Sequence, residues 1–231
     1  MRVFITGDTH GDFRRVEDFI VKAETTKDDI LIILGDVGIN YYGGKRDRRL
    51  KENLKDLPLT LFCIKGNHEN YAGNLKTYEI KEFLGGKVFI EEDYPNLIFA
   101  KDGEIYDFNG MKSIVIGGAY SVDKFYRLAM GYKWFEDEQP STEVKEYVES
   151  QLEKLNWNID LVLSHTAPLR YEPVEWFLPV IDQSTVDKST EEWLDTIFER
   201  LTFKKWYCGH YHGSKIADKI NFLYTDIREL K

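Results

Sequence analysis

The sequence predicts an α/β fold built on a mainly parallel sheet, and three observations support this. Three short runs are continuously apolar, as in strands that are buried on both faces: Val3–Ile5, Ile30–Leu34 and Leu59–Ile64. Segments with helical spacing separate these runs, so the order is β-α-β-α-β. Each run ends in a glycine-containing polar turn. Such turns, at the carboxyl ends of parallel strands, are where ligand-binding side chains gather.

The first half of the chain can be assigned in order. A helix is expected behind Asp12, a candidate N-cap, because apolar residues from Phe13 to Ala23 recur with helical spacing. Residues 45–57 are highly charged and suit a surface helix. Residues 87–118 alternate short β-type runs with turn residues, which predicts an antiparallel section.

The second half returns to alternating helices and strands. Ser141 or Thr142 is expected to cap a helix, and residues 161–163 form the next strand. Residues 166–188 are irregular and aromatic, and their length favours a functional loop. The sequence Ser189-Thr190-Glu191-Glu192 has a capping-box pattern and predicts a helix to about residue 201. A strand over 205–208 and two short strands then complete the chain.

The composition describes one soluble domain over residues 1–231, with 42% hydrophobic and 31% charged residues. A net charge of −9 argues against binding to nucleic acid or anionic lipid through overall charge. Cys63 and Cys208 lie in short apolar stretches, so we expect buried free thiols and a cytoplasmic location. No apolar run approaches about 18 residues, so no membrane span is expected.

All five histidines follow apolar runs, in the groups GDTHG, GNHE, SHTAP and GHYH, and Asp8 and Asp36 occupy equivalent positions. Imidazole and carboxylate together suit Zn, Mn or Fe better than Ca or Mg. Asp8 and His10 are two residues apart, so in an extended segment they would point the same way, and His210 and His212 repeat this spacing. The seven nitrogen and oxygen donors, which include Asn67, exceed what one tetrahedral zinc uses. They predict two ions that share a carboxylate.

The order Asp-x-His, Gly-Asp, Gly-Asn-His-Glu, His, Gly-His-x-His resembles the calcineurin-like metallophosphoesterases over residues 8–212. The resemblance implies a two-sheet α/β sandwich with flanking helices. It also implies hydrolysis of phosphate esters by a hydroxide that bridges two divalent ions (Mn, Fe or Zn). It places one ion on Asp8, His10, Asp36 and His212, and the second on Asp36, Asn67, His165 and His210. Asp36 is then the bridge, and His68 is the leaving-group acid or a phosphate contact.

Some residues remain open to more than one interpretation. Arg127 and Arg170 are candidates for binding phosphate through bidentate hydrogen bonds. Glu69 is expected to bond to local backbone. The protein-phosphatase branch of the family reads Gly-Asp-x-Val-Asp-Arg-Gly, whereas residues 35–40 here read GDVGIN, so the second Asp and the Arg are missing. A dedicated Ser/Thr protein phosphatase is therefore disfavoured, and His68 lacks its usual partner unless another carboxylate replaces it.

Two other functions remain as alternatives to a phosphatase of small phosphate esters. A phosphodiesterase acting on nucleotides or nucleic-acid ends would need a basic, aromatic approach to the site, and residues 166–188 are aromatic but not basic. A non-catalytic scaffold on the same fold would have lost ligands, whereas this chain retains all of them. Nucleic acid is thus expected only as a substrate, and the sequence does not indicate an oligomeric state.

Overall fold

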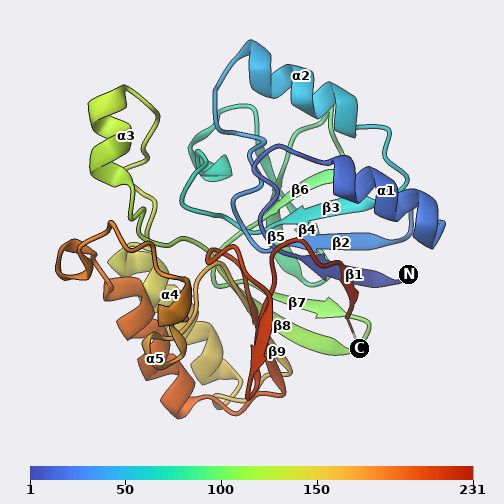
Figure 1. Ribbon diagram of the computed structural model, residues 1–231. Helices are drawn as coiled ribbons and strands as arrows, with labels where there is room; N and C mark the ends of the chain where they lie inside the picture. The colour runs from blue at the N-terminus through green and yellow to red at the C-terminus, as the bar shows by residue number, and fades with distance from the viewer. Residues whose placement is uncertain (231) are drawn as a thin grey trace.

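Two β-sheets pack face to face between two layers of helices (Figure 1). The computed structural model describes residues 1–230, and Lys231 lies outside the described residues. Helices α1 and α2 cover the first sheet, and α4 and α5 cover the second. This arrangement confirms the prediction of a two-sheet α/β sandwich with flanking helices.

The first sheet has the strand order β13-β1-β2-β3-β6-β5-β4. Its centre, from β1 to β6, is parallel, and antiparallel strands complete both edges. The strands are β1 (Val3–Thr6), β2 (Ile30–Ile33), β3 (Thr60–Cys63), β4 (Glu79–Phe83), β5 (Gly86–Ile90), β6 (Leu97–Ala100) and β13 (Arg228–Glu229).

The second sheet has the order β11-β12-β10-β9-β8-β7, with a parallel centre from β8 to β12. The edge strands β7 and β11 are antiparallel to their neighbours. Its strands are β7 (Ile105–Phe108), β8 (Met111–Ile116), β9 (Leu161–Ser164), β10 (Lys205–Cys208), β11 (Lys215–Ala217) and β12 (Ile220–Phe222).

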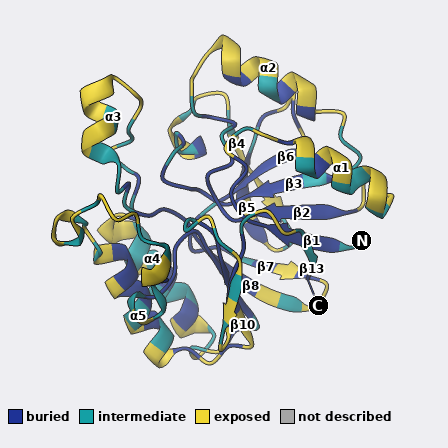
Figure 2. Ribbon diagram, viewed as in Figure 1, coloured by how far each residue is buried: buried dark blue, intermediate teal, exposed yellow. Residues whose placement is uncertain are grey.

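The continuous apolar runs are explained by strands that have a hydrophobic layer on each face. Successive side chains of a strand point to opposite faces of the sheet. In β2, Ile30 and Ile32 therefore join the core between the two sheets, while Leu31 packs toward α1 and α2. In β9, Leu163 joins the same inter-sheet core, and Val162 packs with residues of α4 and α5. Figure 2 shows this buried interior between exposed helical surfaces.

The helices are α1 (Arg14–Ala23), α2 (Lys45–Leu54), α3 (Lys124–Met130), α4 (Thr142–Lys154) and α5 (Ser189–Arg200). Ser141 caps α4 as expected, because its side chain accepts a hydrogen bond from Val144 N. The other two cap predictions are wrong. The N-cap of α1 is Phe13, one residue after Asp12. Ser189 lies inside α5, and the Asp187 side chain accepts the hydrogen bond from its backbone N–H at 2.9 Å.

The strands in the middle of the chain are divided between the two sheets, which the sequence did not predict. Antiparallel pairs form as predicted, but β5 and β6 belong to the first sheet and β7 and β8 to the second. Strand β4 and helix α3 were not predicted. No residue of α3 is buried, and the helix projects from the body (Figures 1 and 2). A helix without a buried face carries no hydrophobic periodicity to reveal it.

Three further predictions can be compared with the structure. Between β9 and α5 the chain forms only the short 3₁₀ turns Leu169–Tyr171, Val174–Trp176 and Gln183–Thr185, so this segment is irregular as expected. Cys63 and Cys208 are buried free thiols. None of the helices within residues 1–230 combines the length and the apolar character that a bilayer span requires.

Candidate metal centre

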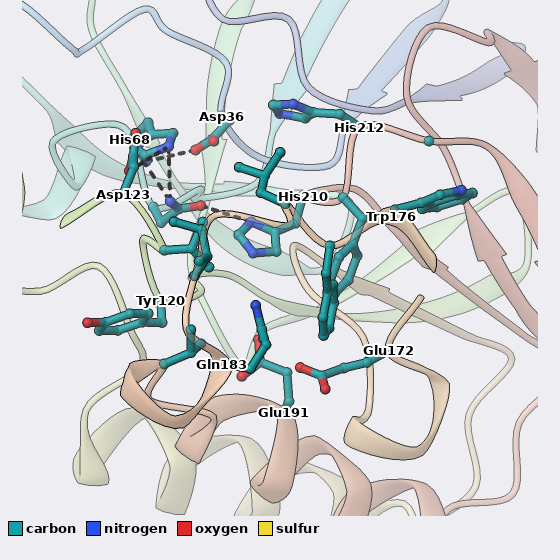
Figure 3. A pocket seen from close by; sticks show the side chains of 18 residues that line it. Asp36, His68, Tyr120, Asp123, Glu172, Trp176, Gln183, Glu191, His210 and His212 are labelled. Atoms are coloured by element: carbon teal, nitrogen blue, oxygen red, sulfur yellow. Dashed lines mark hydrogen bonds and ion pairs between the residues drawn. The ribbon is translucent and has the colours of Figure 1, made fainter. Parts of the chain in front are cut away.

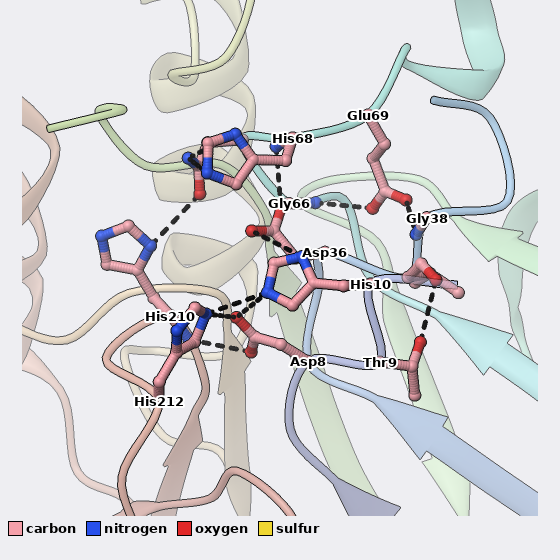
Figure 4. A network of polar contacts seen from close by, with 12 residues as sticks. Asp8, Thr9, His10, Asp36, Gly38, Gly66, His68, Glu69, His210 and His212 are labelled. Atoms are coloured by element: carbon pink, nitrogen blue, oxygen red, sulfur yellow. Dashed lines mark hydrogen bonds and ion pairs between the residues drawn. The ribbon is translucent and has the colours of Figure 1, made fainter. Parts of the chain in front are cut away.

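The seven predicted metal ligands converge at one edge of the sandwich, where parallel strands of both sheets end, and Figure 4 shows five of them, Asp8, His10, Asp36, His210 and His212. Asp8 follows β1, Asp36 follows β2 and Asn67 follows β3. From the second sheet, His165 follows β9 and His210 follows β10. Two sheets packed face to face therefore bring together residues that are about 200 positions apart in the chain.

Asp8, His10 and His212 form the first group of potential ligands, with ligand atoms within 4.8 Å of one another. The Nε2 atoms of His10 and His212 are 2.9 Å apart. Asp8 Oδ2 lies 3.3 Å from His212 Nε2 and 3.8 Å from His10 Nε2. Three donor atoms of the types that bind first-row metals thus surround one point.

Asp8, Asp36 and His165 form a second such group. Asn67 and His210 adjoin it, because Asn67 Oδ1 lies 2.8 Å from His165 Nε2 and 3.2 Å from His210 Nδ1. The two oxygens of Asp36 approach histidines of different groups: Oδ1 is 3.7 Å from His165 Nε2, and Oδ2 is 4.0 Å from His10 Nδ1. Asp36 therefore lies between the two groups. Asp8 is a member of both groups, so they share this carboxylate as well.

The donor set fits divalent cations. One oxygen of each carboxylate is held by backbone, because Asp36 Oδ1 accepts a hydrogen bond from His68 N and Asp8 Oδ1 accepts one from His210 N. Asp8 Oδ2 is buried and accepts no hydrogen bond from any described residue. A buried carboxylate oxygen without a donor is costly unless a cation satisfies it.

The charge state of the cluster agrees with this fit. Burial raises the pKa of Asp36, but the charges of His165, His68 and His10 outweigh it and hold that pKa well below its usual value. Burial, together with the nearby His165, lowers the pKa of His210 to about 3. At neutral pH Asp36 is therefore an ionised carboxylate and His210 a neutral imidazole, which are the forms that bind metal.

Backbone turns set the direction of these side chains. The prediction of an extended segment at Asp8 and His10 is therefore wrong. His10, Asp36, His210 and His212 all have left-handed backbone, with φ of 48°, 46°, 67° and 50°. His10 does reach Asp8, but through a turn. His210 and His212 diverge, since His210 lies beside Asn67 and His212 beside Asp8 (Figure 4). Left-handed backbone at non-glycine residues is uncommon and clusters at functional sites.

Glu69 ties together the loops that carry Asp36 and Asn67. Its Oε1 accepts a hydrogen bond from Gly66 N at 2.9 Å, and its Oε2 accepts one from Gly38 N at 3.3 Å (Figure 4). Glu69 therefore bonds to backbone, as expected. Burial and the neighbouring Asp36 raise the pKa of Glu69 to about 8, so a third negative charge is largely avoided at neutral pH.

His68 has partners that the local motif lacks. Asp123, the N-cap of α3, places Oδ1 3.9 Å from His68 Nε2. Arg127 Nη2 lies 3.2 Å from the same nitrogen, and Arg127 Nε donates to both oxygens of Asp123. A carboxylate and a guanidinium thus lie beside His68, supplied by an element more than 50 residues further along the chain. Asn40 takes no part, since it bonds to Tyr78.

Arg170 is not brought to the cluster. Its guanidinium pairs with Asp195 at 2.7 Å and with Glu199 at 2.6 Å, both on α5. It does not line the cavity described below. The structure therefore gives no support to the expectation that Arg170 binds phosphate.

A cavity of about 460 Å³ opens beside the cluster (Figure 3). Asp36, Asn67, His68, His210 and His212 line one end of it. The remaining lining residues are mostly aromatic or apolar and come from 120–123, 172–191 and 211–213. The expected functional role of the 166–188 loop is thus consistent with its position. Glu191 also lines the cavity. The sequence did not indicate this position, because residues 189–192 matched a capping-box pattern.

The fold and the site together define a class, the metal-dependent hydrolases that carry their ligands at the strand ends of an α/β sandwich. The family follows from comparison with known proteins. A sequence model of the calcineurin-like phosphoesterases matches residues 1–214, and the chain belongs to that family. It is accordingly a metal-dependent hydrolase of phosphate esters.

Solved structures support the fold. The protein TT1561 of Thermus thermophilus is 15% identical and aligns with a TM-score of 0.53 over 96% of this chain and 88% of its own. A second structure, also 15% identical, covers 96% of this chain and 89% of its own at a TM-score of 0.49, which is too low to add support. No curated protein matches the sequence significantly.

The lack of room for a side chain at Gly66 gives a first prediction. A Cβ there would lie 2.1 Å from both the backbone N and Oδ1 of Asp36, so Gly66→Ala must displace Asp36. We expect it to lower the free energy of unfolding by about 1–3 kcal/mol and to reduce bound metal. Gly110→Ala is the control, because its Cβ would meet nothing within 4 Å and only its left-handed backbone (φ 85°) is strained. Thermal unfolding and elemental analysis provide the measurements. Full metal content in Gly66→Ala would contradict the argument.

Proposed function

We propose that the protein is a phosphatase of small phosphate esters that works with two divalent ions, Mn, Fe or Zn. The observation that carries the proposal is the pair of buried carboxylates, Asp8 and Asp36. They face imidazoles from both sheets, and no described lysine or arginine pairs with either of them. Two ions would add four positive charges to these two negative ones, which leaves a positive site for phosphate in an acidic protein.

The proposed ligands follow the grouping of the side chains. One ion is held by Asp8, His10, Asp36 and His212, and the other by Asp36, Asn67, His165 and His210. Support comes from the short distances within each set and from the central position of Asp36. When bound, such ions supply positive charge for the phosphate and activate water near neutral pH.

The protein's own groups would handle the proton and the phosphate. His68 lies at the edge of the cluster and lines the cavity, so its ring can protonate the departing alkoxide in the fraction of molecules that carry the imidazolium, because burial and the charge of Arg127 lower its pKa. Arg127 lies beside His68 and is positioned by Asp123, and its guanidinium can donate to a phosphate oxygen. Asp123 thus acts as a positioning residue.

The environment favours a small ester over a nucleic acid. No lysine or arginine is among the described residues that line the cavity, so it offers no track for a polyanionic backbone. A cavity of about 460 Å³ suits a small molecule. The complete ligand set supports an enzyme over a scaffold, and the buried free thiols agree with a cytoplasmic location.

Metal dependence is the first test of this function. Purified protein is assayed with p-nitrophenyl phosphate, its bis ester and cyclic nucleotides, each with Mn, Zn, Fe or Mg. We expect hydrolysis of the monoester with Mn, Fe or Zn, weaker activity with Mg, and none after chelation, because the nitrogen-containing donor set disfavours Mg. Full activity in chelated protein would overturn the proposal.

The bridging role of Asp36 gives a second prediction. Asp36→Asn should retain less metal than Asp8→Asn or His165→Ala, because both ions lose a charged ligand at once. Elemental analysis of the purified variants measures this, and Asp226→Asn, which changes an exposed aspartate outside the cluster, is the control. Metal content in Asp36→Asn equal to that of Asp8→Asn would rule out the bridge.

The role of His68 gives a third prediction. His68→Ala should lower kcat by about 10²-fold or more with alkyl phosphates, the usual range for a general acid. The loss should be clearly smaller with p-nitrophenyl phosphate, whose leaving group needs little protonation. Asp123→Asn should show the same trend more weakly. Rates across a series of leaving groups provide the measurement. Equal losses throughout the series would assign His68 to phosphate binding.

A further inference from the structure

The cavity beside the metal ligands has a second polar end. Figure 3 shows Asp36, His68 and His210 toward one end and Glu172, Gln183 and Glu191 toward the other. Apolar and aromatic side chains line the same cavity, among them Trp176, Phe177 and Val186. A phosphate at the metal ligands would therefore direct the rest of its ester along an apolar wall toward two carboxylates.

The negative charges of this cavity are not equally compensated. Arg127 pairs with Asp123, and Lys188 pairs with Glu172 at 2.7 Å. Glu191 lies on α5 and is only 4% exposed, and no described cation forms an ion pair with it. It is the carboxyl of this end of the cavity whose charge the fold leaves unmatched.

Glu191 is nevertheless held in a fixed position. Its Oε1 accepts a hydrogen bond from Thr166 Oγ1 at 2.8 Å, and Thr166 Oγ1 lies 3.0 Å from the hydroxyl of Tyr211. Burial raises the pKa of Glu191 to about 7, as expected for a carboxyl that lacks a cationic partner. Such a group gains most from a ligand that brings N–H donors or positive charge.

The wall of the cavity is also fixed in place. A Cβ on Gly213 would lie 2.6 Å from the Trp176 ring, so the indole packs directly against backbone. The ring also meets Phe222 edge to face, with centroids 5.8 Å apart. A rigid aromatic wall that leads to a buried carboxyl suits a flat or apolar group ending in a hydrogen-bond donor.

We propose that this cavity selects phosphate esters whose alcohol part has an apolar or aromatic body and ends in N–H donors that bind Glu191. An ammonium group and the N–H edge of a nucleobase such as guanine both supply donors of this kind. A second phosphate or a carboxylate at the same place would bring no N–H donor to Glu191 and would be repelled by its ionised form, so it would be rejected. The inference rests on the proposed function, because it assumes that the phosphate lies at the metal ligands.

The test uses matched aryl phosphates with the full-length, metal-loaded protein. The substrates are 4-(aminomethyl)phenyl, 4-methylphenyl and 4-(carboxymethyl)phenyl phosphate, which differ mainly in the charge at the far end. We expect kcat/KM for the ammonium ester to exceed that for the carboxylate ester by about tenfold or more. Guanosine 5′-monophosphate and adenosine 5′-monophosphate form a second arm. A guanosine ester that surpasses the ammonium ester identifies the donor as a nucleobase edge.

Glu191→Gln keeps the shape of the side chain and an oxygen for Thr166 but removes the charge. We expect the ratio between ammonium and carboxylate esters to fall below about threefold in this variant. Glu192→Gln is the matched control, because it makes the same change on the next, exposed residue of α5 and should keep the wild-type ratio. A wild-type ratio near or below one overturns the proposal, and this result does not depend on whether a variant folds.

A binding measurement separates this inference from the proposed function. Calorimetry with 4-(aminomethyl)phenol, the product alcohol, needs no hydrolysis. Binding to wild type and to Glu192→Gln, but not to Glu191→Gln, supports the cavity even if no phosphate ester is hydrolysed, in which case only the proposed function fails. Hydrolysis without discrimination by charge, together with no binding of the phenol, overturns the cavity and leaves the proposed function intact.

Discussion

Two buried carboxylates that pair with no lysine or arginine among residues 1–230 are the constraint on which the rest of the site depends. Asp8 and Asp36 repel each other in a region of low dielectric constant, so the fold must supply compensation. Backbone N–H groups hold one oxygen of each, and the imidazoles of His10 and His212, one from each sheet, face the others. The raised pKa of Glu69 serves the same end, because a neutral carboxyl can tie loops together without adding charge.

Much of the architecture could be predicted from the sequence, because one physical cause acts on all central strands. Each has a hydrophobic layer on both faces, so its residues are continuously apolar and its polar residues are confined to the end. Because the polar residues lie at the strand ends, the seven proposed ligands come together at one edge of the sandwich. The detailed aim of the side chains could not be predicted. An extended chain was expected at Asp8 and His10, whereas His10 lies in a left-handed turn, and spacing alone does not distinguish the two.

The residues that sequence reasoning missed reach the site through tertiary structure. Asp123 is the N-cap of a short helix with no buried face, so neither periodicity nor a motif marks it, whereas Arg127 on the same helix was a candidate from the sequence. Both residues lie beside His68 in space, so a residue missing from the local motif does not prove that His68 lacks a neighbouring carboxylate or guanidinium. Glu191 was not recognised from the sequence as a residue of the cavity, for another reason. Its sequence matched a helix-capping pattern, while in the structure Asp187 bonds to the first turn of α5 and Glu191 is buried beside Thr166.

The left-handed backbone at the proposed ligands links metal binding to local folding. A non-glycine residue in this conformation costs about 1–2 kcal/mol, and His10, Asp36, His210 and His212 all adopt it at the same edge of the sandwich. Cations that bind only this arrangement offset the cost in proportion to their free concentration, by mass action. Without them this cost is not offset, and we expect amide hydrogens in these turns to exchange faster than in the metal-bound protein. The supply of metal in the cell would then set how long this edge of the sandwich stays ordered, and with it how long the chain resists proteolysis.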